Sequence, residues 1–158
     1  MLRLCSTQFY QTGLLFLIML YVVEGVSVFS HIHAPDESYD HDSYTLYFNS
    51  DDKTMLRFAE KDVDIKAIKY TTGEEIFCVR MSCRATYGDK FLPSPPIFDK
   101  DNNPLVLTQE IPRYHPVKVK FEIEKSKAVL SREYFLIIKA IQLLEDIPSP
   151  FENVENFL

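Results

Sequence analysis

This sequence has few glycines and lacks the catalytic motifs that depend on glycine. The 158-residue chain has four glycines, and it contains neither a phosphate-cradling glycine loop nor the Gly-x-Ser-x-Gly motif of serine hydrolases. The His-Glu-x-x-His motif of zinc proteases is also absent. Adjacent acids such as Asp51 and Asp52 fall on opposite faces of a strand or in a turn, where water solvates them. The sequence offers no catalytic constellation, so we favour a protein that is not an enzyme.

Clusters of basic residues are missing as well. The formal net charge is -6, and lysines and arginines are scattered among the acidic residues. Proteins that bind nucleic acid usually concentrate positive charge on one face, because the phosphate backbone dominates affinity. From composition alone, we therefore predict no nucleic-acid partner.

The chain has no apolar run long enough for a membrane-spanning helix, which takes about twenty residues. Its longest run, Leu14 to Val23, is about half that length, follows Arg3 and precedes small residues, as is typical of a signal peptide. We predict that residues 1-27 are a signal peptide, with an uncleaved anchor as the alternative. The mature chain would be secreted or lie in the lumen of the secretory pathway, without a mature transmembrane segment. Cuts that leave a small residue at the end of the peptide follow Gly25, Ser27 and Ser30.

The remaining sequence is rich in strand patterns. Hydrophobic residues make up 46% of the chain, which is enough for one domain with a sizeable core. Apolar and charged residues alternate from Val117 to Glu124 and again from Glu75 to Tyr87, as in half-buried strands. Tyr134 to Ile141 is almost continuously apolar and needs cover on both faces. The fold class that we predict is all-β, an antiparallel β-sandwich of about seven or eight short strands.

The other elements follow from turn residues and prolines. We expect a hairpin of Ser43 to Asn49 with Thr54 to Ala59, and further strands at Val63 to Ala67 and Leu105 to Glu110. A C-terminal helix from Arg132 to Asp146, capped by Ser131, is the alternative to a last strand. The predicted division of the chain is a signal peptide, 1-27, an acidic His-containing arm, 28-42, the sandwich, 43-143, and an acidic Pro-containing tail, 144-158.

Cys78 and Cys83 are the two cysteines that would remain after signal cleavage, and an exported pair favours a disulfide. On a straight strand their α-carbons would be about 16 Å apart at roughly 3.3 Å per residue, whereas a bridge needs less than about 7 Å. We predict a bridge closed by a bulge or tight turn, with two unpaired thiols as the alternative.

Two metal sites are conceivable. Oxygen-bearing side chains stand at the spacing of an EF-hand calcium loop, at Asp99, Asp101, Asn103 and Glu110. Pro104 occupies the position where that loop needs glycine, which favours a solvated turn and leaves the calcium loop as the alternative. Cleavage after Ser30 would give His31 a free amine, which with His33 could coordinate copper in a nitrogen site, whereas solvated surface histidines are the simpler explanation.

A stretch near the C-terminus resembles the cadherin family. Leu130 to Ala140, LSREYFLIIKA, is similar to that family's Leu-Asp-Arg-Glu segment and the strand after it, and the acidic DKDNNP is similar to its calcium-binding linkers. Ser131 stands where the family has aspartate. The resemblance implies an extracellular adhesion-type sandwich stabilised by calcium.

The predicted function follows from export, the strand pattern and the missing catalytic motifs. We expect an exported binding or adhesion module with an extracellular or luminal protein partner. The alternatives are a copper-binding protein or oxidase that uses His31, and a calcium-stabilised domain like a cadherin repeat. No other cofactor is expected. The predicted partner-binding residues lie in a proline-rich loop and are Phe91, Leu92, Ile97 and Phe98.

Overall fold

The structure is a computed structural model that describes residues 3–11, 14–37, 42–125, 134–149, 151, 155 and 157, with side chains from Met19 onward. Its elements are strands of 2 to 23 residues and one helix of nine residues. In chain order they are β1 (Arg3–Gln11), β2 (Leu14–Asp36), β3 (Ser43–Asn49), α1 (Asp52–Glu60), β4 (Ile65–Lys69), β5 (Glu75–Arg84), β6 (Thr86–Tyr87), β7 (Lys90–Phe91), β8 (Ile97–Phe98), β9 (Pro116–Lys125) and β10 (Tyr134–Leu143).

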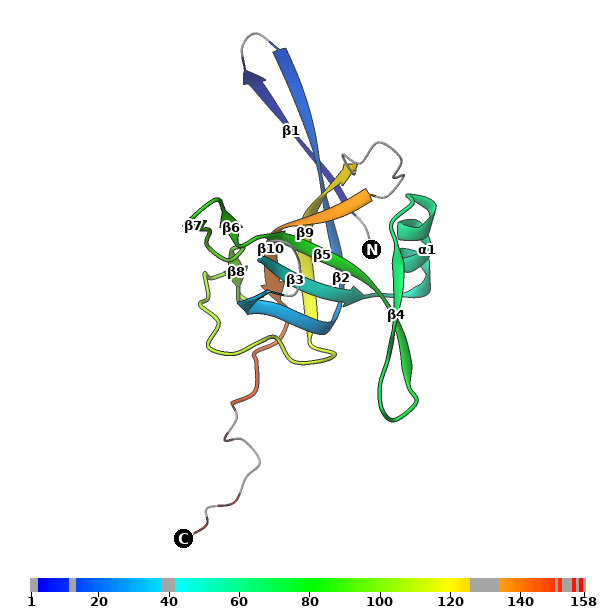
Figure 1. Cartoon of the computed structure of the whole chain (residues 1–158), viewed down its shortest axis with the longest axis vertical. Coiled ribbons are helices and arrows are strands. Elements are labelled where there is room, and N and C mark those ends of the chain that lie inside the picture. Colours follow the sequence, from blue (N-terminus) through cyan, green and yellow to red (C-terminus); the bar gives the residue numbers. More distant parts are fainter. Residues whose placement is uncertain are drawn as a thin grey trace.

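Five of these strands close into a barrel. The main sheet has the order β4-β5-β3-β2-β9-β10-β8, and an additional pairing joins β5 to β10. The ring β2-β3-β5-β10-β9 is therefore complete (Figure 1). Its closing contact is short and parallel, with Leu136 opposite Met81 and Ile137 opposite Ser82. β1 pairs with the first part of β2 in a hairpin that stands out from the barrel (Figure 1).

The prediction of a mostly β protein is confirmed, but the antiparallel sandwich is not. Eight of the strands form one mixed sheet that curls on itself, while β6 and β7 pair separately, and β10 lies parallel to both β5 and β8. β10 is a strand from Tyr134, so the alternative of a helix over Arg132 to Asp146 is wrong. Its continuous apolar run is explained by position, because strands flank it on both sides and the barrel core covers its inner face.

The core fills the inside of the barrel, and α1 closes one end of it. Phe58 of α1 is 1% exposed and packs against the rings of Phe48 and Phe121, with centroids 6.5 and 5.8 Å away. Asp51 caps the helix, since its carboxylate accepts a hydrogen bond from the backbone N–H of Thr54 at 2.8 Å. This hydrogen bonding with Thr54 holds the pKa of Asp51 below its ordinary value.

Two predicted strands are not strands. Thr54 to Ala59 belongs to α1, because the Asp51 cap starts a helix and places Thr54 and Phe58 one turn apart on its buried side. Leu105 to Glu110 lies in a loop that joins β8 to β9, and the strand-like apolar residue Val106 is 88% exposed there.

The predicted signal peptide overlaps the central strand of the barrel. β2 runs without a break from Leu14 to Asp36, and its residues Leu20 to Val26 pair with β9. Val23 and Ser27 are completely buried. Any of the predicted cuts would divide a strand that pairs on both edges. In the part of the chain that is described, no helix has the length and apolar character for crossing a membrane.

Gly25 allows β2 to pass close to β3 in the barrel. A β-carbon at this position would overlap the carbonyl oxygen of Asn49 and the ring of Phe48. Since Phe48 is completely buried in the core, the ring has little room to move. Glycine therefore permits the tight contact between the first two strands of the barrel.

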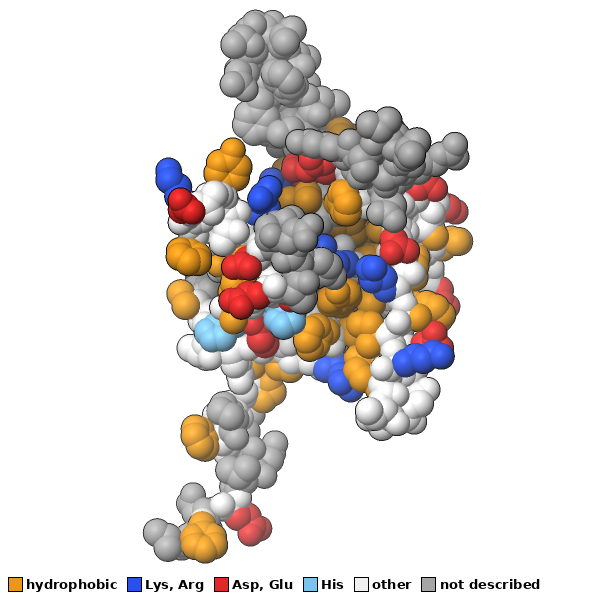
Figure 2. All heavy atoms as spheres, in the orientation of Figure 1, with side chains coloured by type: hydrophobic (Ala, Val, Ile, Leu, Met, Phe, Trp, Pro, Cys, Tyr) orange, Lys and Arg blue, Asp and Glu red, His pale blue; other side chains and the backbone are white. Residues whose placement is uncertain are grey.

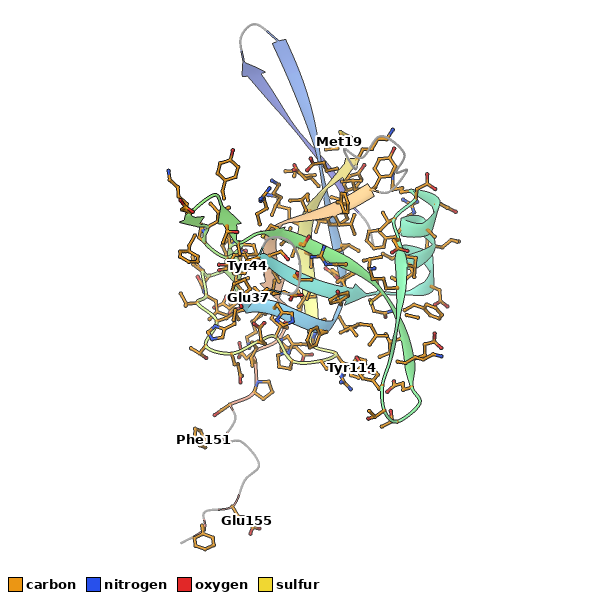
Figure 3. The ribbon with its side chains drawn as sticks, in the orientation of Figure 1. Met19, Glu37, Tyr44, Tyr114, Phe151 and Glu155 are labelled. Atoms are coloured by element: carbon orange, nitrogen blue, oxygen red, sulfur yellow. The ribbon has the colours of Figure 1, made fainter. Side chains whose placement is uncertain are left out.

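The β4–β5 hairpin extends beyond the barrel and is fastened near its tip. The hydroxyl of Tyr114, labelled in Figure 3, donates to Glu74 at 2.9 Å. The guanidinium of Arg113 lies 3.7 Å from the centre of the Tyr70 ring. These contacts tie the hairpin to the loop that precedes β9.

Candidate functional site

The outer surface of β3 and β5 carries a set of aromatic and polar side chains. Along β3, Leu46 and Phe48 point into the core and are completely buried, so the alternate residues Thr45 and Tyr47 lie on the outer face, where Tyr47 is partly exposed and Thr45 is covered. The same alternation along β5 buries Val79 and Met81 and turns Arg80 and Ser82 outward. Figure 1 looks onto this surface, with β3 and β5 toward the viewer.

The strand register lines up four of the outward side chains. Tyr47 is opposite Phe29 of β2 on one edge and Arg80 of β5 on the other. On β10, the pairing of Leu136 with Met81 brings Phe135 beside Arg80. We call Phe29, Tyr47, Arg80 and Phe135 the cross-strand row. Three aromatic rings and one guanidinium thus lie side by side on four strands, because directly paired residues point to the same face.

The rings of the cross-strand row are open to solvent. Phe29 is 50% exposed and Phe135 is 43% exposed, while Tyr47 is half-buried. The rings of Phe29 and Tyr47 are 6.2 Å apart between centroids and tilted by 48°. The core needs none of this exposed aromatic surface, which leaves it available for a planar ligand.

Buried hydroxyl groups hold the guanidinium of Arg80 against the surface. It donates to Ser82 Oγ and Ser43 Oγ at 3.2 Å each, and to Thr45 Oγ1 at 3.5 Å. Ser43 is 3% exposed and Thr45 is fully buried. These hydrogen bonds to hydroxyl groups hold the guanidinium in a defined orientation on the surface.

A pocket of about 190 Å³ opens at the end of the row. Its walls include Val63 near β4, Arg80 of β5 and Phe135 of β10. It forms because β5 changes partner along one edge, pairing first with β4 up to Val79 and then with β10 from Met81. The gap between β4 and β10 leaves a notch with an aromatic wall and a cation.

A second, more polar line of residues runs beside the row. His31, Thr45, Ser82 and Ile137 are in register across the same four strands. The His31 ring meets the Phe29 ring edge-on, with centroids 4.9 Å apart. The surface as a whole therefore combines stacking surfaces with hydrogen-bonding groups.

The charged side chains around this surface are of both signs. Figure 2 shows Lys and Arg as well as Asp and Glu side chains among hydrophobic ones on this face of the molecule. Two of the nearby lysines have carboxylate partners, Lys66 with Asp64 and Lys139 with Glu122, both at 3.3 Å. These ion pairs offset part of the positive charge beside the cross-strand row.

The structure separates the predicted calcium ligands. Asp99 Oδ1 accepts hydrogen bonds from the backbone N–H groups of Asp101 and Asn103, both at 2.9 Å, which is an ordinary aspartate turn. The carboxylate of Glu110 turns to β2 instead and accepts from the backbone of Ile32 at 2.8 Å. Among the described residues, no three His, Cys, Asp or Glu side chains are grouped so that they could hold a metal ion.

The predicted copper ligands lie on a continuous strand. His31 is paired with Thr45 in the middle of the β2–β3 ladder, so cleavage before it would cut the barrel. His33 is exposed and lines a separate pocket with Pro95 and Pro96. In this fold His31 lies within a strand, so it does not carry the free amine on which the copper hypothesis depends.

The predicted disulfide is absent, and both cysteines are free. Cys78 and Cys83 lie five residues apart on the unbroken strand β5, so the bulge that a bridge requires does not form. Burial raises the pKa of each thiol to about 11.

The predicted partner-binding residues do not form one patch. Phe91 is 88% exposed and Leu92 is half-buried, whereas Ile97 is 6% exposed and packs into the core. Phe98 is half-buried. Their role in binding stays a prediction.

No protein-family model and no curated protein sequence matches the chain, but solved structures do. A single-stranded DNA-binding protein encoded by bacteriophage T7 has a TM-score of 0.59 and 13% identity, covering 87% of this chain and 97% of that chain. The single-stranded DNA-binding protein from bacteriophage Enc34 has a TM-score of 0.60 and 10% identity, covering 97% and 96%. The same protein in complex with single-stranded DNA has 0.57 and 10%, covering 85% and 92%. At these identities the likeness establishes a shared fold, an OB-fold-like barrel of five strands.

These comparisons overturn the predicted function. The solved structures described above are phage single-stranded DNA-binding proteins, which contradicts an exported adhesion module, a copper protein and a cadherin-like domain. The same finding contradicts three further predictions, namely the secreted localisation, the extracellular partner and the exclusion of a nucleic-acid partner. The apolar run taken as a signal lies in β2, which pairs with β9 in the barrel from Leu20 onward, and the net charge of the chain does not describe the charge of one surface.

Sequence reasoning missed most of the cross-strand row. The alternation from Glu75 to Tyr87 includes Arg80, but Phe29 falls in the predicted acidic His-containing arm, 28-42. Tyr47 and Phe135 fall in predicted strands, but the sequence did not show on which face of the sheet each side chain lies or which residue lies beside it. The one available signal was the presence of aromatic residues among polar ones in Ser43 to Asn49.

Proposed function

We propose that this chain binds single-stranded DNA on the outer surface of β3 and β5. The observation that carries the proposal is the cross-strand row, in which solvent-exposed rings flank an ordered guanidinium. OB-folds bind oligonucleotides on the corresponding strands, the second and third of the barrel. The single-stranded DNA-binding proteins that share the fold support the same assignment.

Each part of the row has a role in such binding. Bases stack on the rings of Phe29, Tyr47 and Phe135, since every base has a π-face and stacking needs no particular sequence. Arg80 binds a phosphate or stacks on a base, and its hydroxyl partners fix its orientation beforehand. The notch beside Phe135 accepts part of a nucleotide.

The acidic composition is compatible with this function. Stacking contributes about 1 to 3 kcal/mol per base, so a few rings supply much of the affinity without a large basic patch. The net charge of -6 opposes non-specific contact with phosphates elsewhere on the molecule. Binding is therefore expected to need unpaired bases.

Fluorescence anisotropy with a labelled fifteen-nucleotide oligo-dT tests the proposal. Phe135→Ala and Tyr47→Ala should each weaken binding by about 1 to 3 kcal/mol, which is roughly 5-fold to 150-fold in Kd. Leu56→Ala is the matched control, because Leu56 is 60% exposed on α1, outside the row. Its affinity should equal that of the wild type.

A duplex probe completes the experiment, because paired bases cannot stack on the rings. A labelled duplex of mixed sequence should bind much more weakly than the single strand. Wild-type protein that binds neither probe, or binds the duplex as tightly as the single strand, would show the proposal to be wrong. Equal affinity of wild type, Phe135→Ala and Tyr47→Ala would also reject it.

A further inference from the structure

The short β6–β7 hairpin carries an exposed ring at the end of β5. Its strands pair Thr86 with Phe91 and Tyr87 with Lys90, and a two-residue loop joins them. Gly88, the first loop residue, has φ +60, which a tight hairpin turn requires and a β-carbon disfavours. Tyr87 is 68% exposed. A large aromatic side chain is thus held in solvent on a rigid turn.

The base of the hairpin is fixed to the barrel. Leu92 N donates to the carbonyl of Ala85 at 2.7 Å, and Ala85 N donates to that of Asp42 at 3.0 Å. The hydroxyl of Tyr44, labelled in Figure 3, donates to the carbonyl of Leu92 at 2.9 Å. Ala85 is 2% exposed. The position of the tip relative to β3 and β5 is therefore defined by hydrogen bonds.

Two cations flank the Tyr87 ring on the same side of the hairpin. Lys90 is directly opposite Tyr87, and the guanidinium of Arg84 lies 5.8 Å from its ring centre. Phe91 neighbours Lys90 along the strand and therefore points to the opposite side. The hairpin has one acidic residue, Asp89, in its loop. One side thus presents a ring between two positive charges.

This side continues the surface of the cross-strand row. Arg80 and Arg84 project from the same face of β5, four residues apart, which is about 13 Å along a strand at roughly 3.3 Å per residue. The Arg84 side chain reaches forward to Thr86, where its Nε donates to the carbonyl oxygen at 3.2 Å. A chain bound at Arg80 and running along β5 meets Arg84 and then the Tyr87 ring.

We propose that Arg84, Tyr87 and Lys90 form a second stacking site that binds the continuation of the same DNA strand. This inference rests on the proposed function. The row holds a short oligonucleotide by itself, and the hairpin adds one stacked base and phosphate contacts once the strand is long enough. Sites of about 4 to 16 nucleotides per OB-fold span this range of lengths.

The chemistry of the hairpin favours a nucleic acid over a protein partner. The core of a protein interface is depleted of lysine and acidic residues, whereas the Tyr87 ring stands between Lys90 and Arg84. An isolated ring with flanking positive charges suits a base and its phosphates.

Oligonucleotide length separates the two sites. We would measure Kd by anisotropy for five-nucleotide and fifteen-nucleotide oligo-dT with wild type, Tyr87→Ala and Phe91→Ala. Tyr87→Ala should weaken binding of the longer strand at least about fivefold and change that of the shorter less than about twofold. Phe91→Ala is the control on the opposite side of the same hairpin, and it should leave both affinities unchanged.

The chain has no tryptophan, so a single introduced indole reports contact directly. Fluorescence of the Tyr87→Trp variant should be quenched by the longer strand and not by the shorter. Fluorescence of the Phe135→Trp variant should be quenched by both. Since Tyr87 is mostly exposed, these substitutions leave the core intact, and an unchanged melting temperature verifies the fold.

The outcomes distinguish this inference from the proposed function. Wild-type protein that binds both lengths equally, or Tyr87→Ala that binds the longer strand normally, would overturn the second site and leave the row in place. Loss of both lengths in Tyr87→Ala would make the hairpin part of the primary site and would also overturn the inference. Wild-type protein that binds neither length would overturn both.

Discussion

The salt dependence of DNA binding is expected to be shallow, because few cations follow the proposed path. Arg80, Arg84 and Lys90 lie along it, while Lys66 and Lys139 beside it already hold carboxylates at 3.3 Å. For single strands, log K falls with log salt by about 0.7 for each phosphate contact. Three contacts give a slope of about -2, so affinity should fall roughly 20-fold between 50 and 200 mM salt. If both lysines exchanged their carboxylates for phosphates, the slope would reach about -3.5.

The assay is a titration of labelled fifteen-nucleotide oligo-dT at several sodium chloride concentrations. Lys90→Ala should make the slope shallower by about 0.7, since one phosphate contact is removed. Lys53→Ala, which removes an exposed charge from α1, is the control and should leave the slope unchanged. Phe135→Ala should lower affinity at every salt concentration with the same slope, because stacking releases no counterions.

A slope steeper than about -5 would refute this reasoning. It would mean that many more phosphates are neutralised than the β3–β5 surface provides, and that binding depends on charge elsewhere on the molecule. A Phe135→Ala variant whose salt slope differs from that of the wild type would also contradict the assumption that stacking and phosphate contacts contribute separately to affinity.

Two further predictions concern the barrel itself. Gly25→Ala should destabilise the protein by about 1 to 3 kcal/mol in urea unfolding, because the added methyl overlaps Asn49 and the buried Phe48 ring; an unchanged midpoint would contradict the close approach of β2 and β3. In a Cys5→Ser background, Cys78 and Cys83 should resist alkylation at neutral pH, because burial raises the pKa of both thiols to about 11 and the reactive thiolate forms only as the pH approaches that value. Rapid alkylation of the native protein at pH 7 would disprove the second prediction.

Much of the strand structure could be predicted from periodicity. The alternation from Val117 to Glu124 falls within β9, and the alternation from Glu75 corresponds to β5. Tyr134 to Ile141 falls within β10, where strand propensity favoured the correct choice over a helix. These predictions succeed because every second residue is apolar in a strand that buries one of its faces.

The predictions failed where one local pattern suits two structures. Leu14 to Val23 has the length and apolarity of a signal peptide, but it also has those of a barrel strand with neighbours on both edges. Thr54 to Ala59 has strand-forming residues, but the Asp51 cap and the burial of Phe58 make it helical. Only contacts with distant parts of the chain decide between such alternatives.

The proposed binding surface depends entirely on such contacts. The side chains of Phe29, Tyr47, Arg80 and Phe135 come from four strands, and they become neighbours only through the register of three strand pairs. The composition gives the types of these residues but not which of them are neighbours in space. The net charge of -6 led to the prediction that the protein does not bind nucleic acid. Local sequence thus specified several strands, β5, β9 and β10 among them, and the buried face of those that alternate. The closure of the barrel between β5 and β10 decided which exposed side chains meet, because that pairing joins segments that share no local pattern.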